Sequence, residues 1–328
     1  MIPIIPIIAG VAGVVGAKKG IDGVKKITGA NKKIKEAKSI QEKAKNNVEA
    51  INQQTIKVLD EVGAKELEIL SGFDTFADLI EKIQGRPTFE MFKRDDISIP
   101  EFTASELKEV SVAAKTALAN VVGAAVGYAG AYAATDAVLM VAYSAVSAAT
   151  VGGAATLTTA EAGTAMLATI GGGEALAGAL ILEGLSWGVG ILLAGFVIDR
   201  TGEKLGTNAE KSYEQALKIS DEASLIYRQL NKIKMNTIKF KKYLLKVEKK
   251  YDEYLSRLQK ILIEKNQWKD FTTEEKKATE NLVLLVGLLY KMCKTQLIIK
   301  GEEKNEVNEN DIKDVIGDAK KIMDSIEV

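Results

Sequence analysis

Two long stretches of the chain place apolar residues at alternating spacings of three and four. The first covers residues 27–83 and includes polar residues at two of its repeated positions, Gln41 and Thr55. The second covers residues 209–261 and is more regular. This heptad pattern is typical of helices that pack along a continuous apolar seam. A long helix with a single apolar stripe needs a partner, so we expect the two stretches to form an antiparallel coiled coil.

Four residues represent the seam of the second stretch. Ile226, Ile233, Phe240 and Val247 are seven residues apart, and we predict that they are buried against the helix of residues 27–83. At a rise of ~1.5 Å per residue, the second stretch forms a helix about 80 Å long. The sequence therefore predicts an all-α protein with an extended stalk.

The region between these stretches is almost free of charge. Residues 116–198 contain only four charged side chains, all acidic: Asp136, Glu161, Glu174 and Glu183. The same region holds 14 of the 28 glycines of the chain. Helices of this composition have no face suited to water, so we expect the region to be associated with a membrane or wrapped by the rest of the protein.

Two segments of this region have the length of a membrane-spanning helix. They cover residues 116–135 and 175–198, and about 20 residues cross a hydrocarbon core of ~30 Å. Each contains a G-x-x-x-G pattern, a spacing that allows close helix approach in lipid. The predicted packing surface comprises Gly123, Gly127, Gly184, Trp187 and Gly188. The alternative is an unusually buried hairpin in a soluble protein.

Glu183 makes the second segment a marginal membrane helix, because a charged carboxylate at mid-membrane costs a few kcal/mol. The first segment is rich in alanine and glycine, which favour insertion little. We therefore expect a hairpin that inserts conditionally, or only with copies of itself. Glu183 then faces a water-filled lumen or a helix interface, or lies near the membrane surface.

The chain divides into six parts on these patterns. Residues 1–20 are an apolar N-terminal segment, interpreted as an interfacial or re-entrant anchor or as a helix packed on the hairpin. They lack the basic start of a secretory signal peptide, so none is expected. The remaining parts are a coiled-coil helix (21–84), a linker with two prolines (85–106), the apolar hairpin (107–200), the second coiled-coil helix (201–268) and C-terminal helices (269–328).

The C-terminal part has local signals of its own. Residues 268–271 read as a turn, and Thr272 with Glu275 matches a capping box that opens a helix through Tyr290. Residues 301–310 are expected to be a charged loop. A final amphipathic helix follows, with one apolar face made of Ile312, Val315, Ile316, Ala319, Ile322, Met323 and Ile326.

Composition argues against an enzyme. The chain has no histidine and a single cysteine, Cys293, which excludes histidine-based acid–base chemistry and multi-cysteine metal sites. Residues 10–19 lack the spacing of a phosphate-binding loop. We therefore predict no catalytic residues, no cofactor and no metal. With 44 basic and 44 acidic side chains, nucleic acid is not an expected partner.

Basic residues suggest an orientation at the membrane. Lys108, Lys115, Arg200 and Lys204 flank the hairpin, whereas residues 136–175 contain no lysine or arginine. The positive-inside tendency then places both long helices in the cytoplasm, with the protein on the inner membrane. The lysine-rich stretch 232–250 has three interpretations: a solvated coiled-coil face, a surface for anionic lipid, or a weak nucleic-acid site.

The order of long helix, apolar Gly/Ala-rich hairpin and long helix resembles two groups of proteins. These are the α-helical pore-forming proteins of the cytolysin A and apolipoprotein-L types and the bacterial glycine-zipper coiled-coil proteins. The resemblance rests on residues 116–198 and their flanking heptads, and it implies insertion into a lipid membrane and homo-oligomerisation. The expected function is permeabilisation or remodelling of a bilayer. The alternative is a membrane-tethered scaffold whose coiled coil recruits a protein partner.

Overall fold

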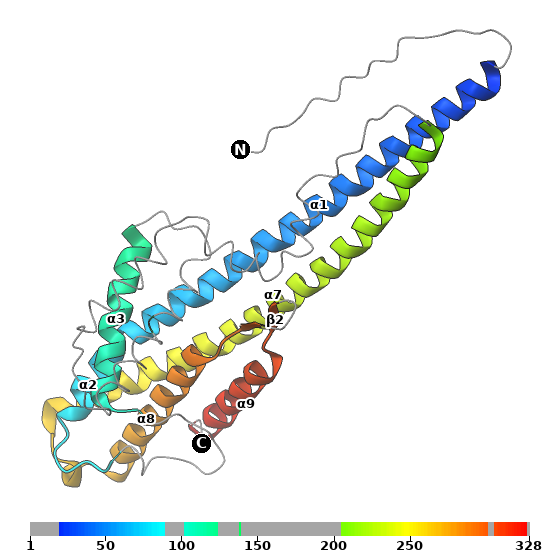
Figure 1. Ribbon diagram of the computed structural model, residues 1–328. Helices are drawn as coiled ribbons and strands as arrows, with labels where there is room; N and C mark the ends of the chain where they lie inside the picture. The colour runs from blue at the N-terminus through cyan, green and yellow to red at the C-terminus, as the bar shows by residue number, and fades with distance from the viewer. Residues whose placement is uncertain (1–19, 89–101, 124–137, 139–204, 301–304, 327–328) are drawn as a thin grey trace, which may run out of the picture.

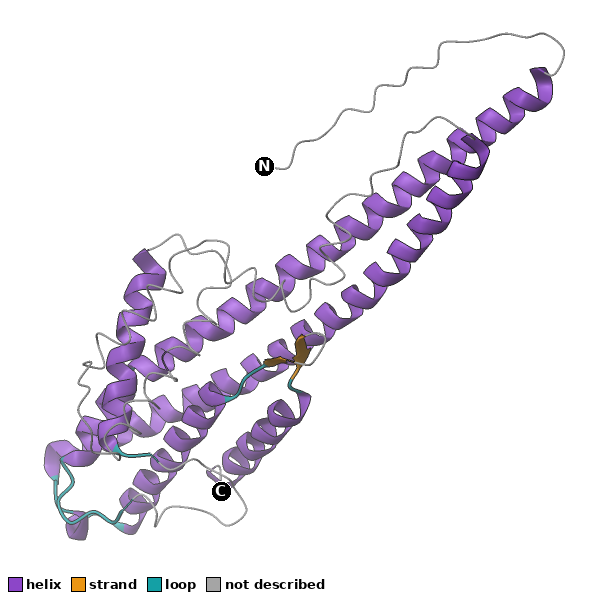
Figure 2. Cartoon of the chain, in the orientation of Figure 1, coloured by secondary structure: helices purple, strands orange, loops and turns teal. Residues whose placement is uncertain are grey.

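A computed structural model describes residues 20–88, 102–123, 138, 205–300 and 305–326 of the chain. The described part is all-α, as the sequence predicts, with one small β-hairpin (Figures 1 and 2). The elements are α1 (Gly20–Ser71), α2 (Phe73–Glu81), α3 (Ala104–Gly123), α7 (Leu205–Glu264), the 3₁₀ turn η2 (Trp268–Asp270), α8 (Thr273–Lys294), β1 (Ile298–Lys300), β2 (Asn305–Val307) and α9 (Glu309–Ile326).

The two long helices, α1 and α7, pack along each other in a parallel arrangement. Lys33 of α1 pairs with Glu210 near the start of α7. Lys65, far along α1, pairs with Glu248, far along α7. Figure 1 shows both helices running from the narrow end of the molecule to the broad end. The predicted antiparallel pairing is therefore wrong.

The length of the intervening chain makes a parallel pair possible. An antiparallel pair needs only a short connection, whereas a parallel pair needs a connection that returns to the starting end. Residues 72–204 separate α1 from α7, and α1 is about 78 Å long at ~1.5 Å per residue. This connection is long enough to return to the starting end of α1, and α3 forms the first part of that return. An a/d seam carries no information on helix direction, so the heptads alone favour neither arrangement.

The first predicted helix is divided into two by a turn at Gly72. Its backbone N–H donates to the carbonyl of Ile69 at 3.1 Å, and α2 starts at the next residue. Helix α2 ends at Glu81, and the turn that follows it contains Gly85, which has a positive φ of 68°. Glycine tolerates this conformation because it has no Cβ. Just before it, Gln84 forms a parallel bridge with Gln267, which joins the end of α2 to the turn after α7.

Helix α3 runs antiparallel to α2. It starts at Ala104, inside the predicted 85–106 linker, and continues into the predicted apolar hairpin. One face of α3 is buried at a spacing of three and four residues, through Leu107, Val110, Ala114 and Ala117. This first part of the predicted hairpin therefore packs as an amphipathic helix on the helical core.

The C-terminal part folds back along α7. The capping box at the start of α8 is present, with the Thr272 side chain accepting from the Glu275 backbone and the Glu275 side chain accepting from the Thr272 backbone. Helix α9 begins near Lys232, which pairs with Glu309, and ends near Tyr254, whose hydroxyl donates to the carbonyl of Ile326 at 3.3 Å, so it runs parallel to α7. The predicted 301–310 loop is wrong in part. Residues Asn305–Val307 form a strand that pairs with Ile298–Lys300, and α9 begins at Glu309.

Burial along α1 reflects the change in packing from one end to the other. Towards its N-terminal end only the seam is buried, at Ala30, Ala37 and Ala44. Beyond Ile51 the buried face widens, because α3 and α8 also pack on α1 there. The molecule is thus a two-helix stalk that leads into a broader bundle (Figure 1).

Candidate functional site

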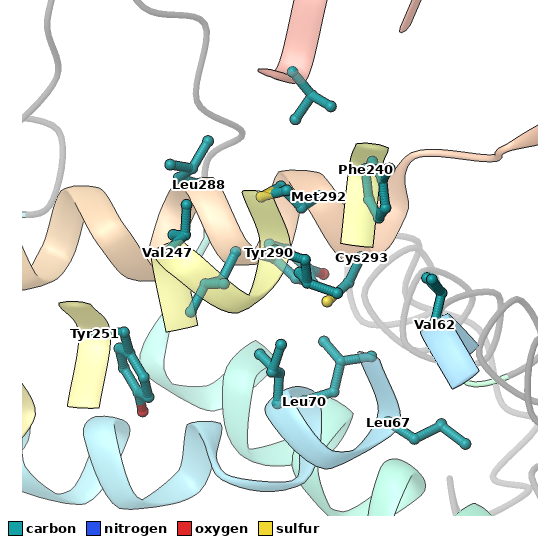
Figure 3. Packing of buried hydrophobic residues seen from close by; sticks show 14 of the residues in the cluster. Val62, Leu67, Leu70, Phe240, Val247, Tyr251, Leu288, Tyr290, Met292 and Cys293 are labelled. Carbon is teal, nitrogen blue, oxygen red and sulfur yellow. The ribbon is translucent and has the colours of Figure 1, made fainter. Parts of the chain in front are cut away.

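The predicted seam of α7 is buried as a continuous stripe. Ile226, Ile233, Phe240 and Val247 have exposed fractions of 7%, 2%, 0% and 0%. All four belong to the hydrophobic core that α7 shares with α1. Figure 3 shows Phe240 and Val247 of α7 in the same cluster as Val62, Leu67 and Leu70 of α1.

Polar contacts beside the seam fix how α1 and α7 are aligned. The hydroxyl of Thr55 lies 2.8 Å from the carbonyl oxygen of Ile51 and 3.2 Å from that of Leu230 across the interface. Thr55 is fully buried, so this polar seam position is satisfied by hydrogen bonding rather than by exposure. The Nζ of Lys241 lies 2.9 Å from Glu61, on the flank of the same seam. Together these contacts favour a single register.

Aromatic side chains join α2, α3, α7 and α8 in the broad bundle. The ring of Phe73 packs edge-on against the rings of Tyr251 and Tyr290, each at 6.3 Å between centroids. The Tyr290 hydroxyl donates to Oε1 of Glu106 at 2.6 Å, which ties α8 to the start of α3. Burial, together with this bond to Glu106, raises the pKa of Tyr290 above its ordinary value. The hydroxyl is therefore a permanent donor at neutral pH.

Cys293 lies in the same core and has the environment of a structural residue. It is 3% exposed, and burial raises the pKa of its thiol well above the ordinary value. Because the thiolate is the reactive form, a buried thiol with a raised pKa is chemically inert. Within the described residues, no group of three or more His, Cys, Asp or Glu side chains is placed to hold a metal ion.

Helix α3 packs on both α1 and α2, and its ion pairs join it to α2. Lys108 lies 2.8 Å from Asp78 and 2.7 Å from Glu81, and Lys115 pairs with Asp74. The hydroxyl of Ser111, between the two lysines, donates to the carbonyl of Ser71 at 2.5 Å. These contacts form a polar clamp on one side of the buried apolar face of α3.

The charge state of the clamp follows from its contacts. Burial acts to raise the pKa of Asp74, but the hydrogen bond and the charge of Lys115 outweigh it, so the pKa of Asp74 lies below its ordinary value. The hydrogen bonds to Asp78 and Glu81 raise the pKa of Lys108. Asp74 and Lys108 are therefore both charged at neutral pH.

The clamp was not predicted, although its signal is visible in the sequence. Acidic residues at 74, 78 and 81 lie on one face of α2, and basic residues at 108 and 115 lie on one face of α3. When α2 and α3 run antiparallel, the acidic residues of α2 lie opposite the basic residues of α3.

The predicted packing surface of the apolar region lies almost entirely outside the described residues. Gly123 is the last residue of α3. Gly127, Glu183, Gly184, Trp187 and Gly188 lie outside the described residues. Among the described helices, none combines the length and the apolar character that crossing a bilayer requires.

The described helices do fix where the apolar region is attached. At one end it follows Gly123, the last residue of α3, twelve residues beyond the Ser111 hydroxyl that donates to Ser71 at the end of α1. At the other end it leads into Leu205, which the Lys33–Glu210 pair places beside α1 near residue 28. At ~1.5 Å per residue, the two points of attachment are about 50 Å apart along the stalk.

Comparisons with known proteins give no relative for this chain: no family model, no curated protein and no solved structure matches it.

Proposed function

We propose that this protein is a membrane-active helical protein that inserts its apolar region into a bilayer, self-associates, and permeabilises or remodels the membrane. One observation carries the proposal: residues 116–198 contain four charges and half of the glycines, between two helices with regular heptads. A region of this composition is stable in lipid or under a protein cover. The described helices supply a stalk and a bundle to which the region is attached.

Insertion of a hairpin requires a change in the attachment of α3. Two antiparallel spanning helices begin and end on the same side of the membrane, close together. Here the two ends of the apolar region are attached about 50 Å apart along the stalk. In the proposed mechanism α3 therefore leaves α2 and moves with the apolar region, while α1 and α7 stay paired.

The attachment of α3 is suited to such a release. The ion pairs of the clamp are partly exposed: the side chains of Asp78 and Lys115 are 61% and 53% accessible, and those of their partners Lys108 and Asp74 are 36% and 29% accessible. Exposed pairs contribute little to stability and are weakened by competing charges. The four seam positions on the buried face of α3 hold one leucine, one valine and two alanines. This face therefore buries less apolar area than a face of larger side chains.

Dye release from vesicles tests the proposal. The control variant replaces residues 124–204 with a Gly/Ser linker of equal length. Such a linker has a root-mean-square span of about 50 Å, so it can join α3 to α7 without disturbing either. The full chain should release the contents of vesicles, and the variant should not, while keeping its helical circular dichroism. Equal dye release from both chains would contradict the proposal.

Self-association through the predicted glycines is tested separately. Replacing Gly127 and Gly188 with leucine adds apolar area, which favours insertion, and removes the small surface needed for close helix approach. We expect membrane binding that is equal to or stronger than that of the unmodified chain, with loss of dye release and of crosslinked oligomers. Dye release that persists or increases would mean that these glycines are not the contact.

The second candidate is a scaffold tethered by the same region. It is favoured by the two-helix stalk, which extends beyond the bundle and offers a long surface to a partner protein (Figure 1). A scaffold binds vesicles without releasing their contents, so the same dye assay separates the two functions.

A further inference from the structure

We infer that the outer face of α7 between Leu225 and Lys249 is a docking surface for an anionic lipid bilayer. The inference rests on the proposed function, since it names the surface that meets the membrane before the apolar region inserts. This surface, called the outer α7 face below, consists of Leu225, Arg228, Met235, Ile238, Lys239, Lys242, Leu245, Lys246 and Lys249, all of which are exposed.

The position of the outer α7 face follows from the heptads. The seam residues Ile233, Phe240 and Val247 are buried against the rest of the bundle. With 3.6 residues per turn, Lys242 and Lys249 then project from the opposite side of the helix. The face runs for about 36 Å along a single helix at ~1.5 Å per residue, so its side chains form a row.

The charge of the outer α7 face is uniformly positive. Between Glu222 and Glu248, α7 contains no acidic residue. Glu248 itself lies beside the seam, 3.2 Å from Lys65 of α1. No described acidic side chain forms an ion pair with Lys239, Lys242, Lys246 or Lys249.

Other lysines of the same stretch have structural partners, which separates them from the outer α7 face. Lys241 pairs with Glu61 of α1, Lys234 donates to the side chain of Gln54, and Lys232 pairs with Glu309 of α9. The lysine-rich stretch thus divides into lysines that hold the bundle together and lysines that face outward.

One lysine of α9, Lys320, lies beside the outer α7 face. The ring of Tyr243 has the Nζ of Lys246 at 5.6 Å and the Nζ of Lys320 of α9 at 5.7 Å from its centroid. Two helices therefore contribute ammonium groups around one half-buried tyrosine. Tyrosine is favoured at membrane interfaces because its ring is apolar and its hydroxyl is polar.

Apolar side chains between the lysines favour a bilayer over other anions. Met235, Ile238 and Leu245 are 55%, 43% and 39% exposed. An interfacial helix inserts such residues between headgroups while its lysines contact the anionic lipids. A free phosphate ion would leave them in water. Single-stranded nucleic acid binds by stacking on aromatic rings, and in this stretch of α7 one exposed ring, that of Tyr227 at 42%, accompanies four exposed non-aromatic apolar side chains.

Charge neutralisation tests the outer α7 face directly. The test variant carries Lys239→Gln, Lys242→Gln, Lys246→Gln and Lys249→Gln in the full chain. The matched control carries Lys35→Gln, Lys43→Gln, Lys45→Gln and Lys57→Gln, four exposed lysines of α1 that give the same change in net charge. Binding is measured by flotation with phosphatidylcholine vesicles, with and without phosphatidylserine.

We expect the test variant to lose affinity for phosphatidylserine vesicles by on the order of a hundredfold or more, since each lysine near an anionic surface contributes severalfold. The control should lose far less. Equal losses in both variants would overturn the inference, because net charge alone would then explain binding. Unchanged binding of the test variant would overturn it as well.

A second variant, Ile238→Ser with Leu245→Ser, keeps the charge and removes the apolar contact. It should also weaken vesicle binding, and unchanged binding would point to a purely ionic site and overturn the bilayer assignment. If the four lysines were needed for binding a short RNA but not for binding vesicles, the bilayer assignment would be overturned as well.

The outcome separates this inference from the proposed function. If the four-lysine variant binds vesicles normally and dye release is intact, the inference fails and the proposed function stands. If vesicle binding depends on the four lysines but neither chain releases dye, the inference stands and permeabilisation fails.

Discussion

Replacing Phe240 with alanine should cause a large loss of stability. The side chain is 0% exposed within the core shared by α1 and α7. Removing a fully buried phenylalanine costs about 3–5 kcal/mol, through lost burial and the cavity that remains. A natural domain has only about 5–15 kcal/mol of stability, so the variant should unfold at a much lower urea concentration.

Ile238→Ala is the matched control for this change. Ile238 lies two residues away on the same helix and is 43% exposed. Both variants introduce alanine, so both favour the helix intrinsically, and the difference between them isolates burial in the seam. Surface changes of this kind stay within about 0.5 kcal/mol. Urea unfolding followed by circular dichroism measures both. Superimposed unfolding curves would refute the seam as an interface.

Three further predictions concern the bundle. Leu107→Ala removes a fully buried side chain of α3 and should weaken its packing by about 2–5 kcal/mol; amide exchange in α3 should then be faster, and unchanged exchange would argue against the packing described. The pKa of Asp74 is lower in the folded protein than its ordinary value of 3.8. The ionised side chain therefore stabilises the fold above pH 3.8, and this contribution is lost as the pH falls through the pKa of the folded state. Asp74→Asn should therefore flatten the acid limb of the stability curve, and an identical acid limb would contradict the Lys115 pairing. The thiol of Cys293 should react with a maleimide dye only after unfolding, because it is buried and its pKa is raised; rapid labelling of the folded protein would show an open core.

Much of the helical architecture could be predicted because local patterns determine it. The three–four spacing identified the buried face of α7 down to single residues such as Phe240. The capping box at Thr272 located the start of α8, since a threonine and a glutamate three residues apart satisfy the first free N–H groups of a helix. The proline at 87 and the glycine at 85 located the end of the first helical part.

Helix direction could not be predicted from the same patterns. A seam such as that of α1 is equally apolar when read in either direction, and the long connection allows a parallel or an antiparallel partner. Charge pairs beside the seam carry the missing information. Gln54 and Glu61 lie seven residues apart on α1 and contact Lys234 and Lys241 of α7 in the same order, which only a parallel pair allows.

The clamp on α3 was missed for a related reason. When α2 is considered alone, its acidic residues resemble ordinary exposed carboxylates on a solvated helix face. The contact exists only because α3 turns back along α2, and the sequence was interpreted with a linker up to residue 106. The strand at Asn305–Val307 was missed because its three residues are too few to show an alternating pattern.

Dye release from a chain whose α3 is tethered to α2 tests the account most directly. Asp74→Cys and Lys115→Cys replace an ion pair between these helices, and a bifunctional methanethiosulfonate joins the two thiols in a link that a reductant cleaves. Buried Cys293 should not react, and the unmodified chain treated with the same reagent checks this. The account predicts vesicle binding without dye release while the link is closed, and release once it is reduced. Equal dye release before and after reduction would contradict it.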